Sequence, residues 1–340
     1  MGGILNCDLA IIGAGPAGCA AAIAAQRAGL QTILLEAQAK PGPAPGETLH
    51  PGVEVIFRQL GVWDEILAAG FHRHEGVWRV VAGRRSFVPY GADGNGPWLG
   101  LQADRRTLHL ILQNGALEAG AQILRPARPT GVLRRGNRVA GIALGDSAIN
   151  ARWVIDASGR RAWLARALEL TANRLDSDLR VRFGWTKAEC PDLGGNPLFN
   201  QYTDGWEWRA PLGQGRLAWV TLSFSPAIAG SRNQGGGGMD LTWRCYRNCA
   251  GPGYFMTGDA AMLLDPASSN GVLRALMSAM LAVHLIGAVR REELDADAAS
   301  RAYNAAINQV FDHCAAELRE LYFAAGAKRA RSFPRRGKAA

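Results

Sequence analysis

The sequence predicts an α/β protein in which a parallel sheet with a dinucleotide-binding motif carries an inserted, mostly antiparallel sheet. The first observation behind this prediction is the order strand, glycine-rich turn, helix and strand over residues 8–36. The second is that related glycine- and aspartate-containing motifs recur at residues 154–160 and 258–271. The third is the stretch 179–224, where aromatic residues and an alternation of apolar and polar positions indicate antiparallel strands.

The opening unit has the pattern of two buried parallel strands joined by a tight turn and a helix. Residues 9–12 and 32–35 are short apolar runs of the kind that form such strands, and an alanine-rich helical stretch lies between them. Each glycine of the turn GAGPAG has a steric purpose. Gly13 allows the tight turn, Gly15 lets the backbone approach a pyrophosphate, and Gly18 lets the helix pack closely on the strand.

The residues around this turn predict which dinucleotide is bound. Pro16 and Ala17 begin the helix, whose unpaired N–H groups would face the phosphates. Glu36 ends the second strand, at the distance from the glycines where a carboxylate accepts a hydrogen bond from a ribose 2′-hydroxyl. An acidic residue at this position favours FAD or NAD and disfavours NADP.

The composition is that of an ordinary globular protein. The chain has 340 residues, of which 48% are hydrophobic and 20% charged, so it is long enough for about two domains. The net charge of +9 is not spread evenly, because six positive charges lie in residues 328–340, which hold no acidic residue. The rest of the chain carries only +3, which disfavours a nucleic-acid partner, and residues 328–340 are expected to form a basic disordered tail.

No segment of the sequence indicates export, a membrane span or a metal site. Asp8 interrupts the apolar core that a signal peptide needs, and we therefore expect a cytoplasmic protein. The apolar stretch 272–289 contains Arg274 and His284 and is expected to be a buried helix rather than a membrane span. Six cysteines are too few for a disulfide framework in a chain of this length, and their spacing suits no zinc site.

The remaining chain alternates between helical and strand patterns. Helices are expected at residues 53–60, 64–69, 106–119, 272–290 and about 298–324. Strands are expected at residues 77–81, 86–90, 122–124, 130–133, 139–144, 153–156 and 254–256, the fourth and fifth of them as a hairpin turned at residues 135–137. The glycine run 234–238 is expected to be a flexible connection, followed by one helix or strand at residues 241–247.

The motifs at residues 154–160 and 258–271, VIDASGR and GDAAMLLDPASSNG, narrow the cofactor to FAD. With the first glycine motif they give the chain a resemblance to the FAD-dependent monooxygenase and halogenase superfamily. In that superfamily a GxGxxG turn, an Asp-Gly element and a Gly-Asp element follow one another in this order. The resemblance implies a Rossmann-like FAD-binding domain of the GR2 type, with a parallel sheet, and an inserted antiparallel sheet that binds the substrate.

The FAD-binding domain is expected to be discontinuous, because its motifs lie at both ends and in the middle of the chain. We expect it to comprise residues 1–75, 100–170 and 250–327. The substrate-binding sheet domain is expected to comprise residues 76–99 and 171–249.

Several residues of the two later motifs are implied by the resemblance to bind FAD. Asp156 and Gly159 belong to the Asp-Gly element, and Gly258 opens the Gly-Asp element. Asp259 should accept hydrogen bonds from the hydroxyls of the ribityl chain.

The residues before the long apolar helix are implied to lie at the flavin ring. The N–H groups around Asn270 and Gly271, at a helix N-terminus, should face the flavin N1 and C2 carbonyl, where negative charge collects on reduction. Pro266 would lie beside the ring, near the site of oxygen attack.

Two further segments are similar to segments of the superfamily. Gly46, Glu47 and Thr48 belong to GETLHP, which resembles the loop that passes over the flavin ring. Arg105 opens RRTL, which is similar to the Arg-x-x-Leu helix start whose arginine reaches the FAD. The alternative for Arg105 is a solvated surface arginine.

The nearest branch resembles the tryptophan halogenases and the monooxygenases that hydroxylate a protein-bound tryptophan during quinone-cofactor maturation. Residues 205–211, GWEWRAP, resemble the halogenase signature WxWxIP with alanine in place of isoleucine. Trp206 and Trp208 are therefore expected either to line the substrate pocket or to be core residues. The halogenases also use a lysine after the loop over the flavin. His72 stands at that place, and the nearest lysine, Lys40, precedes the loop, which favours oxygen insertion over halogenation.

The sequence therefore predicts an enzyme, an FAD-dependent monooxygenase that hydroxylates an aromatic ring, including tryptophan in a peptide or protein. The oxygen would be transferred from a flavin C4a-hydroperoxide. His50 and His72 are candidates for proton transfer, because imidazole titrates near neutral pH, and each could equally be structural. A second GxGxxG motif is absent, so electrons would come from NAD(P)H bound transiently or from a separate flavin reductase.

Three alternatives are compatible with the same motifs. A flavin-dependent halogenase and a double-bond reductase of the prenyl-reductase type are both enzymes. A flavoprotein that assists the maturation of a partner enzyme is an alternative from another class. The substrate is expected to be an aromatic small molecule or a peptide or protein. The segment between residues 224 and 254 is shorter than the resemblance to the superfamily leads us to expect. Such a short segment would leave the substrate pocket open, which favours a peptide or protein as the substrate.

Overall fold

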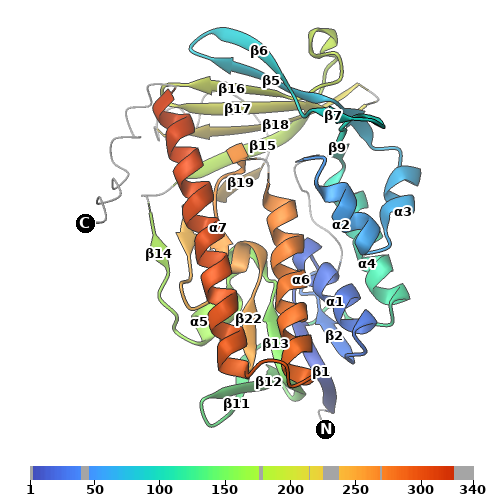
Figure 1. Ribbon diagram of the computed structural model, residues 1–340, viewed down its shortest axis with the longest axis vertical. Helices are drawn as coiled ribbons and strands as arrows, with labels where there is room; N and C mark the ends of the chain where they lie inside the picture. Colours follow the sequence, from blue (N-terminus) through green and yellow to red (C-terminus); the bar gives the residue numbers. More distant parts are fainter. Residues whose placement is uncertain are drawn as a thin grey trace.

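The computed structural model describes residues 3–39, 46–175, 179–213, 215–224, 237–268 and 270–324. It confirms the predicted α/β class, with one mainly parallel sheet and one mainly antiparallel sheet. The two sheets lie toward opposite ends of the molecule, and two long C-terminal helices run between them (Figure 1). The predicted basic tail lies outside the described residues.

The parallel sheet is built from strands that are far apart in the sequence. In spatial order its strands are β10 (Gln122–Leu124), β2 (Thr32–Leu35), β1 (Ile4–Ile12), β13 (Ser147–Asp156), β12 (Arg138–Leu144) and β11 (Gly131–Arg135), while β22 (Tyr254–Met256) pairs with β13 and with β21 (Ala250–Gly251). The neighbours β1, β13 and β22 are parallel. Ile12 lies opposite Asp156, which lies opposite Met256, so the loops that follow these three strands meet at one edge of the sheet.

Four helices surround this sheet, namely α1 (Pro16–Arg27), α4 (Arg105–Glu118), α6 (Gly271–Arg290) and α7 (Ala296–Ala324). Helix α1 packs against α4 and α6, and α6 packs against α7. The buried positions of α1 are mostly alanine, and such short side chains let its neighbours approach closely. Within the described part of the chain, α6 is the one helix long and apolar enough to cross a membrane, and half of its apolar stretch is buried inside the protein.

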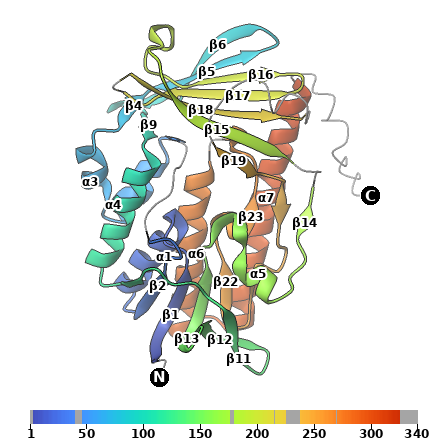
Figure 2. The same cartoon turned by 180° about the vertical axis from the view of Figure 1, so that it is seen from behind.

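The antiparallel sheet combines two separate parts of the chain. Its order is β19 (Gly237–Asp240), β15 (Arg180–Lys187), β18 (Arg216–Ser223), β17 (Gly205–Pro211), β16 (Leu198–Tyr202), β5 (Gly76–Val81) and β6 (Arg84–Pro89). Its neighbours are antiparallel except β16 and β5, which pair in parallel. The last turns of α7 reach this sheet in both views (Figures 1 and 2). The domain boundaries given above stay a prediction.

Apart from a strand or helix expected at residues 241–247, the strands of three smaller sheets have no counterpart among the predicted elements, because strands of two to four residues are too short to show an alternating pattern. The first sheet contains β3 (Glu47–Leu49), β9 (Gly100–Ala103) and β4 (His72–His74); the second β14 (Asn173–Arg174), β20 (Arg244–Cys245) and β23 (Met262–Leu263); the third β7 (Ala92–Asp93) and β8 (Gly96–Pro97). Of the short helices, α2 (Val53–Gln59) and α3 (Trp63–Ala68) confirm the prediction, and α5 (Trp163–Ala167) is additional.

The prediction of a flexible connection at the glycine run is wrong for its last two residues. Gly237 and Gly238 lie in β19, while residues 234–236 lie outside the described residues. A Cβ atom on Gly237 would come within 2.4 Å of the Phe183 ring, so glycine at this position allows two strands to pack closely. Residues 241–247 contain a strand, as one of the two expectations had it, but this strand is only the two-residue β20.

Two buried histidines make the stability of this fold depend on pH. Burial lowers the pKa of His74 in β4 and of His109 in α4 to about 4. In an unfolded chain the pKa of histidine is about 6.5. The unfolded state therefore binds protons first on acidification, so the free energy of unfolding should be highest above about pH 6.5 and fall between about pH 6.5 and 4. The loss should reach roughly 3 kcal/mol for each histidine.

Urea unfolding at a series of pH values from 4.5 to 7.5 would measure this effect. His74→Gln and His109→Gln should each flatten the fall in the free energy of unfolding below about pH 6.5. His313→Gln is the matched control, because His313 is largely exposed on α7. If the free energy of unfolding falls as steeply in His74→Gln and His109→Gln as in the control, these two histidines are not the cause of the pH dependence.

Candidate active site

Two glycines hold the turn between β1 and α1 tightly in place. Gly13 has a φ of +104°, which favours glycine, and a Cβ atom there would lie 2.5 Å from the carbonyl oxygen of Ala157. A Cβ atom on Gly18 would lie 1.8 Å from the carbonyl oxygen of Gly13. The turn is thus pressed against the end of β13, and α1 is pressed against the turn.

Gly15 differs from these two glycines because no heavy atom lies within 4 Å of where its Cβ atom would be. Gly15 directly precedes Pro16, the first residue of α1, and has an ordinary extended backbone with φ −81° and ψ −174°. The open space therefore lies beside the first turn of a helix, whose N–H groups lack partners within the helix. An anionic pyrophosphate fits this cradle, because the positive end of the helix dipole attracts it.

Side chains from two other elements fix Ala14, in the middle of this turn. Glu36, which follows β2, accepts hydrogen bonds from the N–H groups of Ala14 at 3.2 Å and Gln38 at 2.8 Å. Gln113 of α4 donates from Nε2 to the carbonyl oxygen of Ala14 at 2.9 Å. A carboxylate has about four acceptor positions, so Glu36 retains capacity for ribose hydroxyls. Its contact with the ribose stays a prediction, and no sequence pattern indicated Gln113.

The structure corrects the role given to Asp156. Its side chain is fully buried and accepts hydrogen bonds from the N–H groups of Ser158 at 2.8 Å and Leu164 at 2.7 Å. Because the carboxylate is fully buried and both of its oxygens accept from the protein, Asp156 orders the turn after β13 and does not itself face a ligand. Gly159, in that turn, has a φ of +64° and open space at its Cβ position, so a direct contact of its backbone with FAD stays a prediction.

Three predicted residues from three distant motifs meet in one charged cluster. Arg105, at the start of α4, forms an ion pair with Glu47 of β3 at 3.1 Å between Nη1 and Oε1. Burial raises the pKa of Asp259, and Arg105 and Arg274 oppose that rise most strongly. Burial also raises the pKa of Glu47, with Arg105 opposing the rise and Asp259 adding to it. Arg160 and Arg244 also oppose the rise, so the charges of four arginines act on the pKa of this one carboxylate.

Asp259 sits where helices α1 and α6 come together. The N–H group of Gly258 donates to Oγ of Ser278 at 2.9 Å. A Cβ atom on Gly258 would lie 3.2 Å from Cβ of Ala275 and 3.4 Å from Cβ of Ala17, so this glycine packs between the first turns of the two helices. Its φ of +56° also favours glycine. The Gly-Asp element thereby lies next to the cradle at Gly15.

The start of α6 is accessible for a ligand. Asn270 precedes the helix, Gly271 is its first residue, and no heavy atom lies within 4 Å of the Cβ position of Gly271. Pro266 is exposed in the single helical turn Pro266–Ser268 that leads to it. Flavin contacts of these three residues stay predictions, and the geometry at this helix end leaves room for them.

The first small sheet carries a row of polar side chains on one face. Thr48, Gln102 and His72 lie opposite one another across β3, β9 and β4. Oγ1 of Thr48 donates to Oε1 of Gln102 at 2.9 Å, and Gln102 is almost fully buried. Nε2 of His72 lies 2.8 Å from the carbonyl oxygen of Gly195, in the segment before β16. His72 therefore connects the small sheet to the antiparallel sheet. Gly46, just before β3, also touches that sheet, because its Cβ position lies 3.0 Å from Ala218.

His50 lies between this small sheet and α6. A Cβ atom on Gly52 would lie 3.5 Å from Nδ1 of His50 and 3.8 Å from Leu273 in the first turn of α6. The His50 ring contacts Tyr90 edge to face, with 5.0 Å between ring centres, and the His74 ring is 5.4 Å from Tyr90. Burial lowers the pKa of His50, which favours the neutral ring near neutral pH. The two predicted histidines, His50 and His72, are thus brought to the same small sheet, and sequence reasoning missed their polar neighbours Gln102, His74 and Tyr90.

The structure decides between the two readings of Trp206. Its side chain is 1% exposed and its Nε1 donates to the hydroxyl of Tyr322 in α7 at 2.8 Å. Trp206 is therefore a core residue, and its assignment as a catalytic, pocket-lining residue is wrong. Trp208, two residues further along β17, lies on the same face of the strand and is only partly buried, so its role in a pocket stays a prediction.

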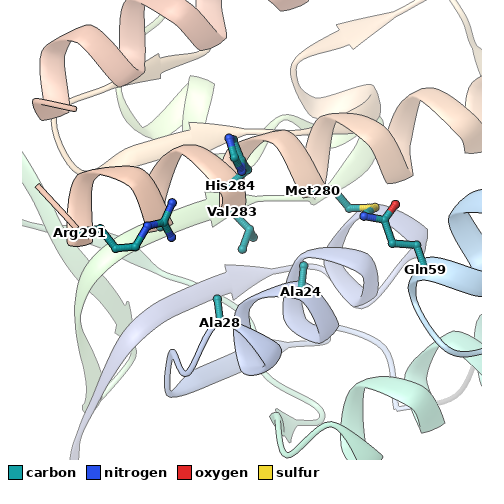
Figure 3. Close-up of a pocket in the computed structure, with 8 residues that line it drawn as sticks. Ala24, Ala28, Gln59, Met280, Val283, His284 and Arg291 are labelled. Carbon is teal, nitrogen blue, oxygen red and sulfur yellow. The ribbon is translucent and has the colours of Figure 1, made fainter. Parts of the chain in front are cut away.

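A groove of about 230 Å³ lies elsewhere on the molecule. It runs between the last turns of α1 and the second half of α6 (Figure 3). Ala28 and Arg291 line it, near the opposite end of α1 from Gly15, and none of the predicted site residues lines it. The groove is therefore separate from the candidate site.

Known proteins resemble this chain in sequence and in fold. Residues 8–168 match the family model of the FAD dependent oxidoreductases. The chain is 24% identical to sulochrin halogenase gedL of Aspergillus terreus over 88% of its own length and 66% of that protein. It is 26% identical to digeranylgeranylglycerophospholipid reductase of Methanothrix thermoacetophila over 83% of its own length and 78% of that protein.

A solved structure has the same fold. The flavin-dependent brominase Bmp2 superimposes with a TM-score of 0.83, covering 94% of this chain and 87% of the brominase at 21% identity. The chain spans about two thirds of the length of sulochrin halogenase gedL. The similarity therefore does not assign the activity of that whole protein to this chain.

The cradle at Gly15 leads to a test of cofactor binding. Gly15→Val should fold, because valine can adopt the extended backbone at this position and meets no protein atom. Its side chain would occupy the space of the pyrophosphate, and we expect FAD affinity to fall by roughly 100-fold or more. Flavin absorbance per chain and a fluorescence titration with FAD measure this loss. Gly3→Val is the control, because its Cβ position is also open but Gly3 precedes β1, at the opposite end of that strand from Gly15.

Asp259 leads to a second test at the other end of the cofactor. Asp259→Asn keeps the size of the side chain and removes the charge that the surrounding arginines balance. We expect FAD to bind about 10-fold more weakly, as for the loss of one charge-assisted hydrogen bond. Asp312→Asn removes a surface carboxylate, paired with Arg247, and should leave FAD binding unchanged. Equal FAD affinity in both variants would contradict a role of Asp259 in the site.

Proposed function

The chain belongs to the FAD-dependent monooxygenase and halogenase superfamily, and from this premise we propose that it is a monooxygenase that hydroxylates an aromatic ring. FAD is its cofactor, and the residues around Gly15, Glu47, Arg105 and Asp259 would hold it. Bound FAD would supply two electrons and the activation of oxygen. One oxygen atom of O2 would replace a ring hydrogen as a hydroxyl group, and the other would leave as water.

The observation that favours hydroxylation over halogenation is the absence of lysine from residues 46–103. The whole chain has four lysines, at positions 40, 187, 328 and 338, and none lies between residues 46 and 103, which contain all three strands of the small sheet. Lys187 ends β15 in the antiparallel sheet, and Lys40 lies outside the described residues. His72 takes the place of the lysine in the superfamily pattern, and its Nε2 is engaged by the Gly195 carbonyl.

The residues of the chain itself would bind and orient the reactants. The start of α6 would stabilise negative charge on reduced FAD through its N–H groups. His50, beside that helix end and neutral near neutral pH, is the candidate for accepting the proton released from the ring. His72 would hold the small sheet against the antiparallel sheet. Electrons would come from NAD(P)H or a separate flavin reductase, in the cytoplasm.

A second candidate function is double-bond reduction. It is favoured by the likeness to the archaeal phospholipid reductase, which is 26% identical. The two functions differ in their use of oxygen, because a reductase would transfer hydrogen from reduced FAD to its substrate without consuming O2. Anaerobic turnover of a substrate with reduced FAD would therefore favour reduction over hydroxylation.

Bromination separates the proposed monooxygenase from a halogenase. We expect the protein loaded with reduced FAD to form no bromotryptophan in the presence of O2, bromide and tryptophan, because residues 46–103, which contain the three strands of the small sheet, hold no lysine. Mass spectrometry of the mixture measures this, with a known flavin brominase as the positive control. Bromotryptophan above a protein-free background would overturn the proposal in favour of halogenation.

The short segment after β18 suggests that the substrate is a peptide or protein. In the described part of residues 224–254, only the short strands β19, β20 and β21 follow the sheet. A small free substrate needs a closed pocket to keep water away, whereas a polypeptide can cover the site itself. We expect free tryptophan and phenols to yield mostly hydrogen peroxide, and tryptophan-containing peptides to raise product formed per O2 consumed. Tight coupling with a free amino acid or phenol would contradict this substrate class.

A further inference from the structure

Asp265 is a buried carboxylate that binds three separate segments of the chain. It lies between β23 and the helical turn Pro266–Ser268 and is fully buried. Its Oδ1 accepts from the N–H group of Ala267 at 2.9 Å. Its Oδ2 accepts from Nε1 of Trp243 at 2.9 Å and from the hydroxyl of Tyr322 at 2.7 Å. These donors come from the loop before α6, the segment before β20 and the last turn of α7.

Tyr322 extends this network into the antiparallel sheet. Its hydroxyl donates to Asp265 and accepts from Nε1 of Trp206 in β17 at 2.8 Å. One residue earlier, the carbonyl oxygen of Leu321 accepts from Nε2 of Gln201 in β16 at 2.8 Å. The last turn of α7 is therefore fixed to two strands of the sheet by hydrogen bonds. It is fixed to the loop before α6 by the bond to Asp265.

The hydrogen bonds of Asp265 are energetically important because the carboxylate is removed from water. Burial raises its pKa, and the hydrogen bonds from Tyr322, Ala267 and Trp243 oppose that rise. A buried carboxylate that loses one of its donors is left partly unpaired, which is costly. The loop around Asp265 is thus held in one conformation only while all three donors are in place.

We propose that Asp265 is a positioning residue that holds the loop between β23 and α6 in the conformation that binds FAD. Through Tyr322 and Trp206 it couples this loop to the antiparallel sheet, so that the sheet expected to carry the substrate also controls the cofactor loop. The proposal rests on FAD binding and not on the hydroxylation proposed above. The FAD dissociation constant and hydrogen exchange can both be measured without substrate, so a protein that fails to hydroxylate would still give a clear result.

Tyr322→Phe tests the coupling with the loss of a single hydroxyl group. We expect the dissociation constant for FAD to rise about tenfold. In the FAD-free protein, hydrogen exchange at the amides of residues 267–274 should become faster. Tyr254→Phe is the matched control, because Tyr254 is also buried and its hydroxyl donates to the carbonyl oxygen of Asn248, away from the loop. This control should lower the melting temperature without changing FAD affinity or exchange at residues 267–274.

Asp265→Asn tests whether the carboxylate links the loop before α6 to the last turn of α7. Asparagine keeps one acceptor oxygen and replaces the other with a donor. If its oxygen accepts from Ala267, the bonds from Trp243 and Tyr322 to Oδ2 are lost, and in the reverse orientation the bond from Ala267 to Oδ1 is lost. We expect a rise in the FAD dissociation constant at least as large as in Tyr322→Phe. Adding Tyr322→Phe to Asp265→Asn should change it less than twofold further, because either substitution already interrupts the hydrogen-bond network that joins the loop to α7.

The opposite results are equally clear. Unchanged FAD affinity in Tyr322→Phe, with a fall in melting temperature equal to that of Tyr254→Phe, would reduce the network to a structural role and overturn the proposal. Effects of Tyr322→Phe and Asp265→Asn that multiply in full in the double variant would show that the two residues act independently, which would also overturn it.

Discussion

Parallel pairing of β1, β13 and β22 is the constraint on which the rest of the site depends. The three strands come from residues 4–12, 147–156 and 254–256, and their carboxyl ends lie level with one another. The turns that follow must share a small space, which is why glycine is required at Gly13 and Gly258, where a Cβ atom would contact neighbouring turns or helices. Close packing of these turns places a helix N-terminus, Arg105 and Asp259 around the same volume.

Two carboxylates in one stretch of chain have different roles because their surroundings differ. Asp259 is surrounded by arginines and remains partly exposed, so it can accept hydrogen bonds from a ligand. Asp265, six residues later, is fully buried and bound by three donors of the protein, so it has no such capacity. Burial likewise separates Glu36 from Asp156. Both carboxylates accept a hydrogen bond from the protein on each oxygen, but Glu36 is only partly buried whereas Asp156 is fully buried.

The α/β class, the glycine turn and most long elements could be predicted because their signals are local. Strands Thr32–Leu35, Gln122–Leu124 and Tyr254–Met256 have the predicted bounds, since each is an apolar run with clear ends. The strands of the three small sheets could not be predicted with their bounds, because they are as short but are not distinct apolar runs, and two to four residues carry no alternating pattern. The roles of Gln113, Tyr322 and Trp206 depend on partners far away in the sequence, and no local pattern records such partners.

The late position of β22 in the chain has a consequence for biosynthesis. The strand that completes the cofactor edge of the parallel sheet is made only after residues 1–253 have been synthesised, and α6 follows it. Contacts between residues so distant in sequence form slowly, since a long loop must close before they are gained. A nascent chain that ends before residue 256 therefore exposes one side of β13 and lacks a complete FAD site. FAD can therefore act as a folding ligand only after β22 and the start of α6 have been made.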